Sequence, residues 1–238
     1  MKVLSANKIF LEALDELYQQ YLPSKHPFFE RLSELPPLKL SSPEFLGELY
    51  LRYQSASHDT RVMVWYLPDL DTAAQRVRKL QIISDDDGGP LENTHHCQLH
   101  NAFQRMCAVC KVNDSEFGNL ERLGSLVDSE TSDFLALVQD LYPKSLGPWC
   151  IIEGFADDWM RALMNGLSGQ FPFVLEEPYF SECLSQGVEE RHAQESLDLT
   201  AEVLLQNPDK LADTIEGARM MAVGLTRFWD SLYELTLE

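Results

Sequence analysis

The stretch CLSQGVEERHAQESLDL, residues 183–199, places Glu189 and His192 three positions apart in what we expect to be a long helix from about Tyr179 to Leu205. Side chains three positions apart lie on the same face of an α-helix. Glu-x-x-His is the pattern by which helices of di-iron carboxylate bundles direct a carboxylate and an imidazole into the core. Such a pair also occurs as an ion pair on helix surfaces, so its meaning depends on the other helices.

Helical periodicity continues through most of the chain, and strand alternation is almost absent. The other expected helices cover residues 5–21, 26–32, 42–49, 71–83, 92–112, 131–141 and 149–167, and a last segment after Asn207-Pro208-Asp209. Residues 60–67 (TRVMVWYL) fit a strand or a buried helix, and we expect a helix because their neighbours are helices. Without an internal repeat or a long linker, we predict a single all-α domain over residues 1–238, with the N-terminal helix (1–22) packed on it.

The composition excludes several classes of partner. The 238 residues carry 19 Lys and Arg against 38 Asp and Glu, a formal net charge of −19. Such a surface repels the phosphates of nucleic acids and of anionic membranes, so we expect neither as a partner. Because 45% of the residues are apolar, the chain can fill a core, which excludes general disorder. The chain has no long apolar run and no signal-peptide pattern, so we expect a cytoplasmic protein.

The cysteines are odd in number and lack the spacing of a disulfide framework, so we expect reduced thiols: Cys97, Cys107, Cys110, Cys150 and Cys183. Cys107 and Cys110 form a Cys-x-x-Cys pair, which raises a thiol-redox function as one alternative. We favour buried structural thiols, because the pair lies inside an expected helix and no βαβ pattern accompanies it.

A second group of candidate ligands lies in DDDGGPLENTHHCQLH, residues 85–100, which holds three of the six histidines beside several acids. Mixed carboxylates and imidazoles suit Fe, Mn or Zn. On a helix, Glu92 shares a face with either His95 or His96. The alternative is a solvated acidic turn with exposed histidines.

Glu153 lies in GPWCIIEGFADDWMRAL, residues 147–163, among large apolar residues. A carboxyl group in such a helix must be paired, protonated or bound to a metal. A hydrogen bond to Tyr or Arg explains Glu153 as well as metal ligation does.

The order of these features resembles the heme-oxygenase-like di-iron oxidases, a group that includes chlamydial CADD and alkene-forming fatty-acid decarboxylases. The resemblance spans roughly residues 24–235 and rests on four features: the stretches His26-Pro27-Phe28-Phe29, Arg76 to Gly89 running into His96, Glu153, and Glu189 to Ala193. The spacing from Glu153 to Glu189 and His192 is similar to that between the family's ligands. The resemblance implies a seven-helix, heme-oxygenase-like bundle with a non-heme dinuclear iron site.

Carried over by position, the resemblance implies five ligands: Asp86, His96, Glu153, Glu189 and His192. His96 is preferred to His95 because Leu99 follows at the family's usual spacing. Two positions depart from the family, which has Glu where Asp86 stands and His where Ser185 stands. Glu92 is the alternative to Asp86, and a second iron would bind weakly, recruit Glu182, or be absent.

The implied function is a non-heme iron oxidase or oxygenase that uses O₂ to oxidise a small organic substrate or its own side chains, with Mn as an alternative metal and a homodimer as the expected assembly. The other hypothesis is a metal-poor or metal-free CADD-like relative that acts as a ligand-binding or protein-interaction module. A substrate carboxylate would need Arg76, Lys79 or Arg161. Composition suggests that Pro36, Pro37, Trp65 and Tyr66 wall a substrate pocket.

Overall fold

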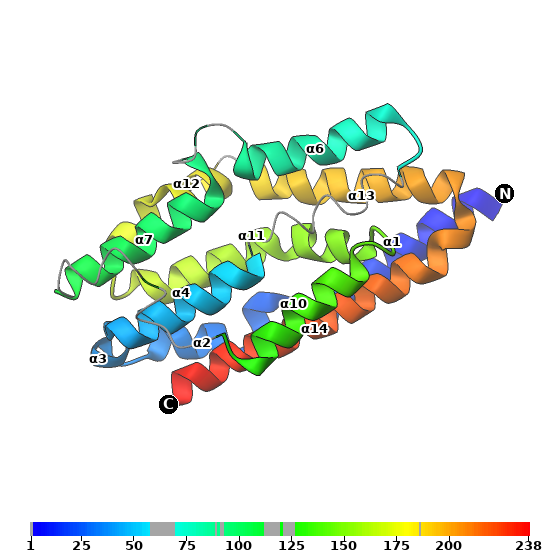
Figure 1. Ribbon diagram of the computed structural model, residues 1–238. Coiled ribbons are helices and arrows are strands. Elements are labelled where there is room, and N and C mark those ends of the chain that lie inside the picture. Colours follow the sequence, from blue (N-terminus) through cyan, green and yellow to red (C-terminus); the bar gives the residue numbers. More distant parts are fainter. Residues whose placement is uncertain are drawn as a thin grey trace.

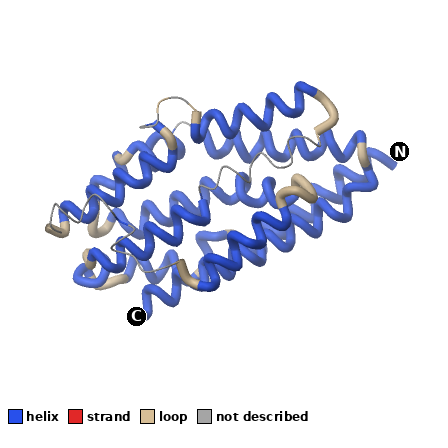
Figure 2. Tube along the Cα trace, in the orientation of Figure 1, coloured by secondary structure: helices blue, strands red, loops and turns tan. Residues whose placement is uncertain are grey.

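The computed structural model describes residues 2–57, 70–88, 90, 93–111, 120, 127–185 and 187–238, apart from the side chains of residues 2–5, 57 and 185. Every regular element within these residues is a helix (Figure 2), which confirms the predicted all-α class. The predicted helix over residues 60–67 and the predicted pocket residues Trp65 and Tyr66 lie outside the described residues.

The longer helices are α1 (Lys2–Tyr21), α4 (Pro43–Ser57), α6 (Ala73–Asp87), α7 (His95–Val109), α10 (Ser129–Leu141), α11 (Gly147–Ser168), α13 (Val188–Gln206) and α14 (Leu211–Leu237). The shorter ones are α2 (Pro27–Glu34), α3 (Pro37–Leu40) and α12 (Pro178–Ser185), with 3₁₀ turns at Pro23–Lys25, Pro172–Glu176 and Pro208–Lys210. Among the helices that the structure describes, none is long and apolar enough to cross a lipid bilayer.

Helix α11 runs through the middle of the bundle and packs against α13 and α14 (Figure 1). Helix α1 contacts α13 and α14, and Tyr18 on α1 donates a hydrogen bond to the carbonyl of Cys150 on α11 (2.9 Å). Helix α6 lies along α13 at one edge of the molecule (Figure 1), while α12 contacts α7, α11 and α13. One continuous cluster of buried apolar side chains joins these helices into a single core.

Local sequence signals explain where several helices begin. Thr72 caps α6 in a capping box with Gln75, and Thr94 caps α7 by accepting a hydrogen bond from the backbone N–H of Cys97. Helix α11 begins at Gly147, where a Cβ atom would overlap the backbone of α14 at Thr214. Glycine therefore allows α11 and α14 to approach closely at this end.

The stretch His26-Pro27-Phe28-Phe29 is structural. His26 caps α2, because its Nδ1 accepts a hydrogen bond from the backbone N–H of Phe28, and its Nε2 lies 3.1 Å from Asp230 Oδ1 on α14. The Phe28 and Phe29 rings pack on Trp229 of α14, with ring centroids 6.2 and 5.0 Å away. These contacts fix α2 to the bundle.

Two predicted helix boundaries were wrong in ways that affect the site. The acidic run Asp85-Asp86-Asp87 does not follow the helix but forms the last turn of α6, which places Asp86 on a rigid element. The predicted helix from Tyr179 to Leu205 is two helices, α12 and α13, separated at Gly187, whose φ of 63° is left-handed. Glycine adopts that conformation without the steric cost that other residues meet.

Candidate metal centre

Glu153 supplies a buried carboxyl group from the middle of α11. Its side chain is 4% exposed, and Oε1 accepts a hydrogen bond of 2.6 Å from Trp149 Nε1, one helical turn earlier. The sequence analysis considered a Tyr or an Arg as the hydrogen-bond partner of Glu153. The partner in the structure is instead the uncharged indole N–H of Trp149. The second carboxylate oxygen, Oε2, lies 4.0 Å from Nδ1 of His192 on the neighbouring helix.

Glu189 and His192 lie in the first turns of α13 and share its buried face, with exposed fractions of 5% and 2%. The surface ion pair considered for this Glu-x-x-His motif is therefore excluded. The turn at Gly187 starts α13 two residues before Glu189, so it sets where both side chains enter the core.

Asp86 on α6 joins the same cluster. Its Oδ1 lies 3.5 Å from Nδ1 of His192 and 3.5 Å from Nδ1 of His95. Together with Glu153 and Glu189, this brings three carboxyl groups and two imidazoles, from four helices, to one place. Asp86, Glu189 and His192 each offer a ligand atom within 4.8 Å of the others.

Two atoms at the centre of this cluster have no hydrogen-bond partner. They are Oδ1 of Asp86 and Nδ1 of His192, both buried. An unpaired buried acceptor costs about 1–3 kcal/mol of stability. A cation between them would satisfy both, because a carboxylate oxygen and a neutral imidazole nitrogen are ligands that Fe, Mn and Zn accept.

The outer nitrogen of His192 is held by a second carboxylate. Nε2 of His192 lies 3.4 Å from Oδ2 of Asp85, which is 35% exposed. A proton on Nε2 donated to Asp85 leaves the lone pair of Nδ1 facing Asp86 and Glu153. This is the arrangement by which carboxylates orient metal-binding histidines.

His95, not His96, belongs to this cluster, which corrects the preference drawn from the spacing to Leu99. His95 lies between Asp86 and Cys183, with Nε2 3.1 Å from Cys183 Sγ. His96 is exposed, and its Nδ1 pairs with Gln54 Nε2 at 3.1 Å. Because successive helical residues are about 100° apart, only one of the two can face inward.

Cys183 was not predicted as a site residue. It is a buried residue of α12, and His95, Cys183 and Glu189 form a second group of atoms within 4.8 Å of one another. Glu189 belongs to both groups. One signal in the sequence could have pointed to it, because Cys183 stands in the same stretch as the Glu-x-x-His motif. The break at Gly187 conceals how close Cys183 lies to that motif in space.

The remaining candidates lie elsewhere. Glu182 is exposed and accepts a hydrogen bond from Gln98 Nε2 (3.2 Å). Arg161 is paired with Asp157 at 2.7 Å, and Arg76 donates to the carbonyl of Leu70. Glu92 and the side chain of Ser185 lie outside the described residues, so their roles stay predictions.

Burial shifts the pKa of each acid in the cluster upward. Desolvation, with the nearby charge of Glu189, raises the pKa of Glu153 to about 8, and desolvation raises that of Glu189 to about 7. Burial, followed by the charges of Glu153 and Glu189, raises the pKa of Asp86 well above its usual value. These carboxyl groups therefore bind protons when no other cation is present.

The same burial keeps the imidazoles neutral. Desolvation, with a smaller contribution from His192, lowers the pKa of His95 to about 4. Desolvation also lowers the pKa of His192, although Asp85 opposes it. Neutral imidazole is the form that binds metals, so neither histidine must lose a proton at neutral pH.

Lys79, which the sequence suggested as a substrate anchor, is 1% exposed on α6. Its ammonium lies 5.1 Å from the ring centroid of Trp149, and burial lowers its pKa to about 8. Its charge opposes the upward shift of the pKa of Glu153. The ammonium of Lys79 therefore stabilises the ionised form of Glu153 from within the core.

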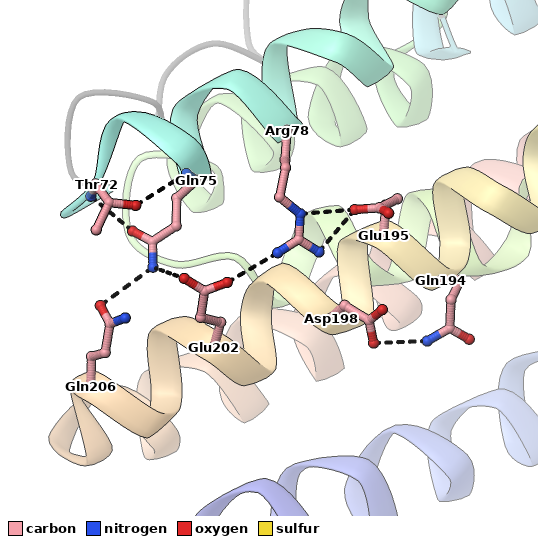
Figure 3. Close-up of polar contacts among 8 residues, drawn as sticks. All are labelled: Thr72, Gln75, Arg78, Gln194, Glu195, Asp198, Glu202 and Gln206. Atoms are coloured by element: carbon pink, nitrogen blue, oxygen red, sulfur yellow. Dashed lines mark hydrogen bonds and ion pairs between the residues drawn. The ribbon is translucent and has the colours of Figure 1, made fainter.

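A pocket of about 360 Å³ between α6 and α13 reaches the cluster, since Asp85 and His192 line it together with Arg78 and Arg191. Polar contacts fix these two helices in register (Figure 3). Arg78 bonds to Glu195 and Glu202, with Nε and Nη1 2.9 and 3.0 Å from the carboxylate oxygens. Gln75 also bonds to Glu202 and Gln206, so α6 is aligned along α13 by contacts that precede the Asp85–His192 contact on α6.

The sequence matches no protein-family model, and none of the curated proteins matches it. In fold, the chain is similar to the crystal structure of a CADD-like protein of unknown function from Nostoc punctiforme. The two share 16% sequence identity and superpose with a TM-score of 0.62, over 97% of this chain and 100% of the other. The chain therefore has a CADD-like helical fold.

Proposed function

We propose that this chain is a non-heme iron oxidase that uses O₂ to oxidise a small organic molecule. The observation that carries the proposal is a pair of buried atoms without a hydrogen-bond partner, Asp86 Oδ1 and His192 Nδ1, which lie 3.5 Å apart among buried carboxyl groups. The metal ligands would be Asp86, His95, Glu153, Glu189 and His192. Bound iron would supply the reduction of O₂, which side chains of this kind do not carry out alone.

The chain's own residues prepare this site. Asp85 lies 3.4 Å from the outer nitrogen of His192 and favours the tautomer with its proton on Nε2, and Trp149 donates a hydrogen bond to one oxygen of Glu153. Glu153 and Glu189, whose pKa values are raised by burial, would release their protons on binding a cation, so the site would stay close to neutral. The apolar core around α11 and α13 excludes water from the ligands.

The pocket between α6 and α13 is the proposed substrate site. Its volume of about 360 Å³ is at the small end of ligand-binding cavities, which favours a small organic substrate. Because the pocket reaches His192 and Asp85, a molecule bound there lies beside the proposed metal ligands.

The test is anaerobic titration of chelator-treated protein with Fe(II), followed by exposure to O₂. We expect at least one tightly bound iron per chain and O₂ consumption, both lost in His192→Ala. His96→Ala is the matched control, because this exposed histidine lies outside the cluster and its variant should bind iron normally. If the wild-type protein binds no iron, the oxidase proposal fails, and the result supports the alternative of a metal-free ligand-binding or protein-interaction module.

A further inference from the structure

Cys183 differs in its surroundings from the other described cysteines. Cys150 bonds to Thr200 Oγ1 at 3.1 Å, and Cys97 Sγ lies 3.9 Å from Asn101 Nδ2, both contacts within the helical scaffold. Cys183 is also buried, yet its sulfur lies 3.1 Å from an imidazole nitrogen of His95 and beside the carboxyl group of Glu189. The partners of Cys183 are an imidazole and a carboxyl group, which are metal-ligand types, whereas Cys150 contacts a hydroxyl and a backbone carbonyl, and Cys97 contacts an amide.

We propose that His95, Cys183 and Glu189 form a thiolate subsite that binds Zn²⁺ beside the Asp86–His192 pair. Cysteine sulfur, histidine nitrogen and carboxylate oxygen are the three donor types that Zn²⁺ takes in proteins. Three protein ligands leave a fourth position for water or a substrate atom, as in catalytic zinc sites. A thiolate favours Zn²⁺ over hard, oxygen-loving cations, whereas Asp86 and His192 lack sulfur.

The distances allow this subsite with a small adjustment. Sulfur and nitrogen bound to one Zn²⁺ at ~2.3 and ~2.0–2.1 Å in a tetrahedron lie roughly 3.5 Å apart. Cys183 Sγ and His95 Nε2 are 3.1 Å apart, so the two side chains need to separate by roughly half an ångström. The three ligands come from α7, α12 and the start of α13, and α12 contacts both other helices.

Loading the subsite exchanges a proton for the metal. The S–H bond of Cys183 breaks, the S–Zn bond forms with the sulfur electron pair, and the proton leaves to the buffer. Thiolate and Glu189 carboxylate then balance the two charges of Zn²⁺. His95 and Glu189 also stand among the proposed iron ligands. With Zn²⁺ on His95 Nε2, a neighbouring cation would be held by Asp86, Glu153 and His192, and Glu189 belongs to both ligand groups. The proposal does not depend on oxidase activity.

The test is titration of metal-free protein with Co²⁺, which reports a thiolate ligand by sulfur-to-cobalt charge transfer in the near ultraviolet. We expect this band in the wild type, its displacement by Zn²⁺, and its loss in Cys183→Ser. The same variant should lose more Zn²⁺ affinity at this subsite than the ~10–100-fold that loss of an outer-shell partner costs, because Cys183 is a direct ligand. Cys107→Ser is the control, since Cys107 is a buried thiol away from the cluster, and it should keep the band.

Zinc X-ray absorption of the wild-type protein identifies the metal ligands directly, so this test does not require that the Cys183→Ser variant folds. One sulfur neighbour at ~2.3 Å supports the subsite, and a shell of only nitrogen and oxygen overturns it. A charge-transfer band that persists in Cys183→Ser also overturns it. If the sulfur band appears but Fe(II)-treated protein consumes no O₂, the oxidase proposal fails while the thiolate subsite stands.

Discussion

Replacing Glu153 by glutamine is expected to stabilise the metal-free protein and to weaken its binding of metal. Glutamine keeps the side-chain oxygen that accepts the hydrogen bond from Trp149, but it carries no charge to desolvate. Burial raises the pKa of Glu153 from 4.5 to about 8. For an acid whose pKa is raised by folding, ionisation opposes folding above the unfolded pKa, and the loss of stability grows until the pH reaches the folded pKa.

The magnitude follows from this shift. At pH 7 the unfolded side chain is ionised and the folded one is protonated, and each unit of pH above 4.5 costs about 1.4 kcal/mol. The wild type therefore loses on the order of 3 kcal/mol at pH 7, and little at pH 5. For a chain of this size, 1 kcal/mol corresponds to about 2–4 °C in the melting temperature. The variant also loses the interaction between the Glu153 carboxylate and the Lys79 ammonium, and this loss reduces the gain in stability.

Thermal unfolding followed by circular dichroism, in chelator at pH 5 and pH 8, measures the effect. The melting temperature of Glu153→Gln should exceed that of the wild type by several degrees at pH 8 and by much less at pH 5. Addition of Mn²⁺ or anaerobic Fe²⁺ should then stabilise the wild type far more than the variant. A variant that is less stable than the wild type in chelator at pH 8, or equally stabilised by metal, would refute the reasoning.

Four other perturbations test neighbouring parts of the structure. Asp85→Asn should lower metal affinity about 10–100-fold in isothermal titration while leaving the melting temperature in chelator unchanged, because Asp85 orients His192 from a partly exposed position. Metal affinity should rise between pH 5 and pH 8, because the pKa values of Glu153 and Glu189 are raised to about 8 and about 7. Metal binding near pH 7 should therefore release protons, which calorimetry in buffers of different ionisation enthalpy measures. Gly187→Ala should cost about 1–2 kcal/mol in denaturant unfolding, since φ of 63° is unfavourable for alanine; an unchanged midpoint would contradict this. Arg78→Ala should lower global stability by no more than about 1 kcal/mol, because its ion pairs are partly exposed, yet hydrogen exchange should report faster opening of α6.

The fold class was predictable because its signals are local. Apolar spacing and capping residues such as Thr72 are encoded within one or two helical turns, and these signals placed most helices within a few residues. The errors arose where one residue outweighs the pattern around it. Gly187 breaks a segment that is otherwise continuous in helical spacing, and the three aspartates continue a helix that we expected to end before them.

The candidate site was partly predictable for a similar reason. Glu153, Glu189 and His192 stand out because polar residues interrupt apolar helix faces, and the structure places all three in one buried cluster. The choice between His95 and His96 depended on the rotation of α7, which a difference of one residue changes by about 100°. Cys183 carried no polar signal, since cysteine is common in cores, and only the packing of α12 brings it to His95.

The arrangement of charge gives a reason why so many unfavourable groups persist in one place. Asp86, Glu153 and Glu189 each have a pKa raised by burial, and two acceptor atoms beside them lack partners. Each feature lowers stability without a cation, and hydrophobic residues of similar size would remove the cost. A divalent cation would turn each of these contributions to the folding free energy from unfavourable to favourable, because it replaces the protons on the acids and binds the two acceptor atoms. A strictly structural role for the cluster therefore makes an opposite prediction: substitutions that remove these acids should then destabilise the protein in chelator, and added metal should leave its melting temperature unchanged.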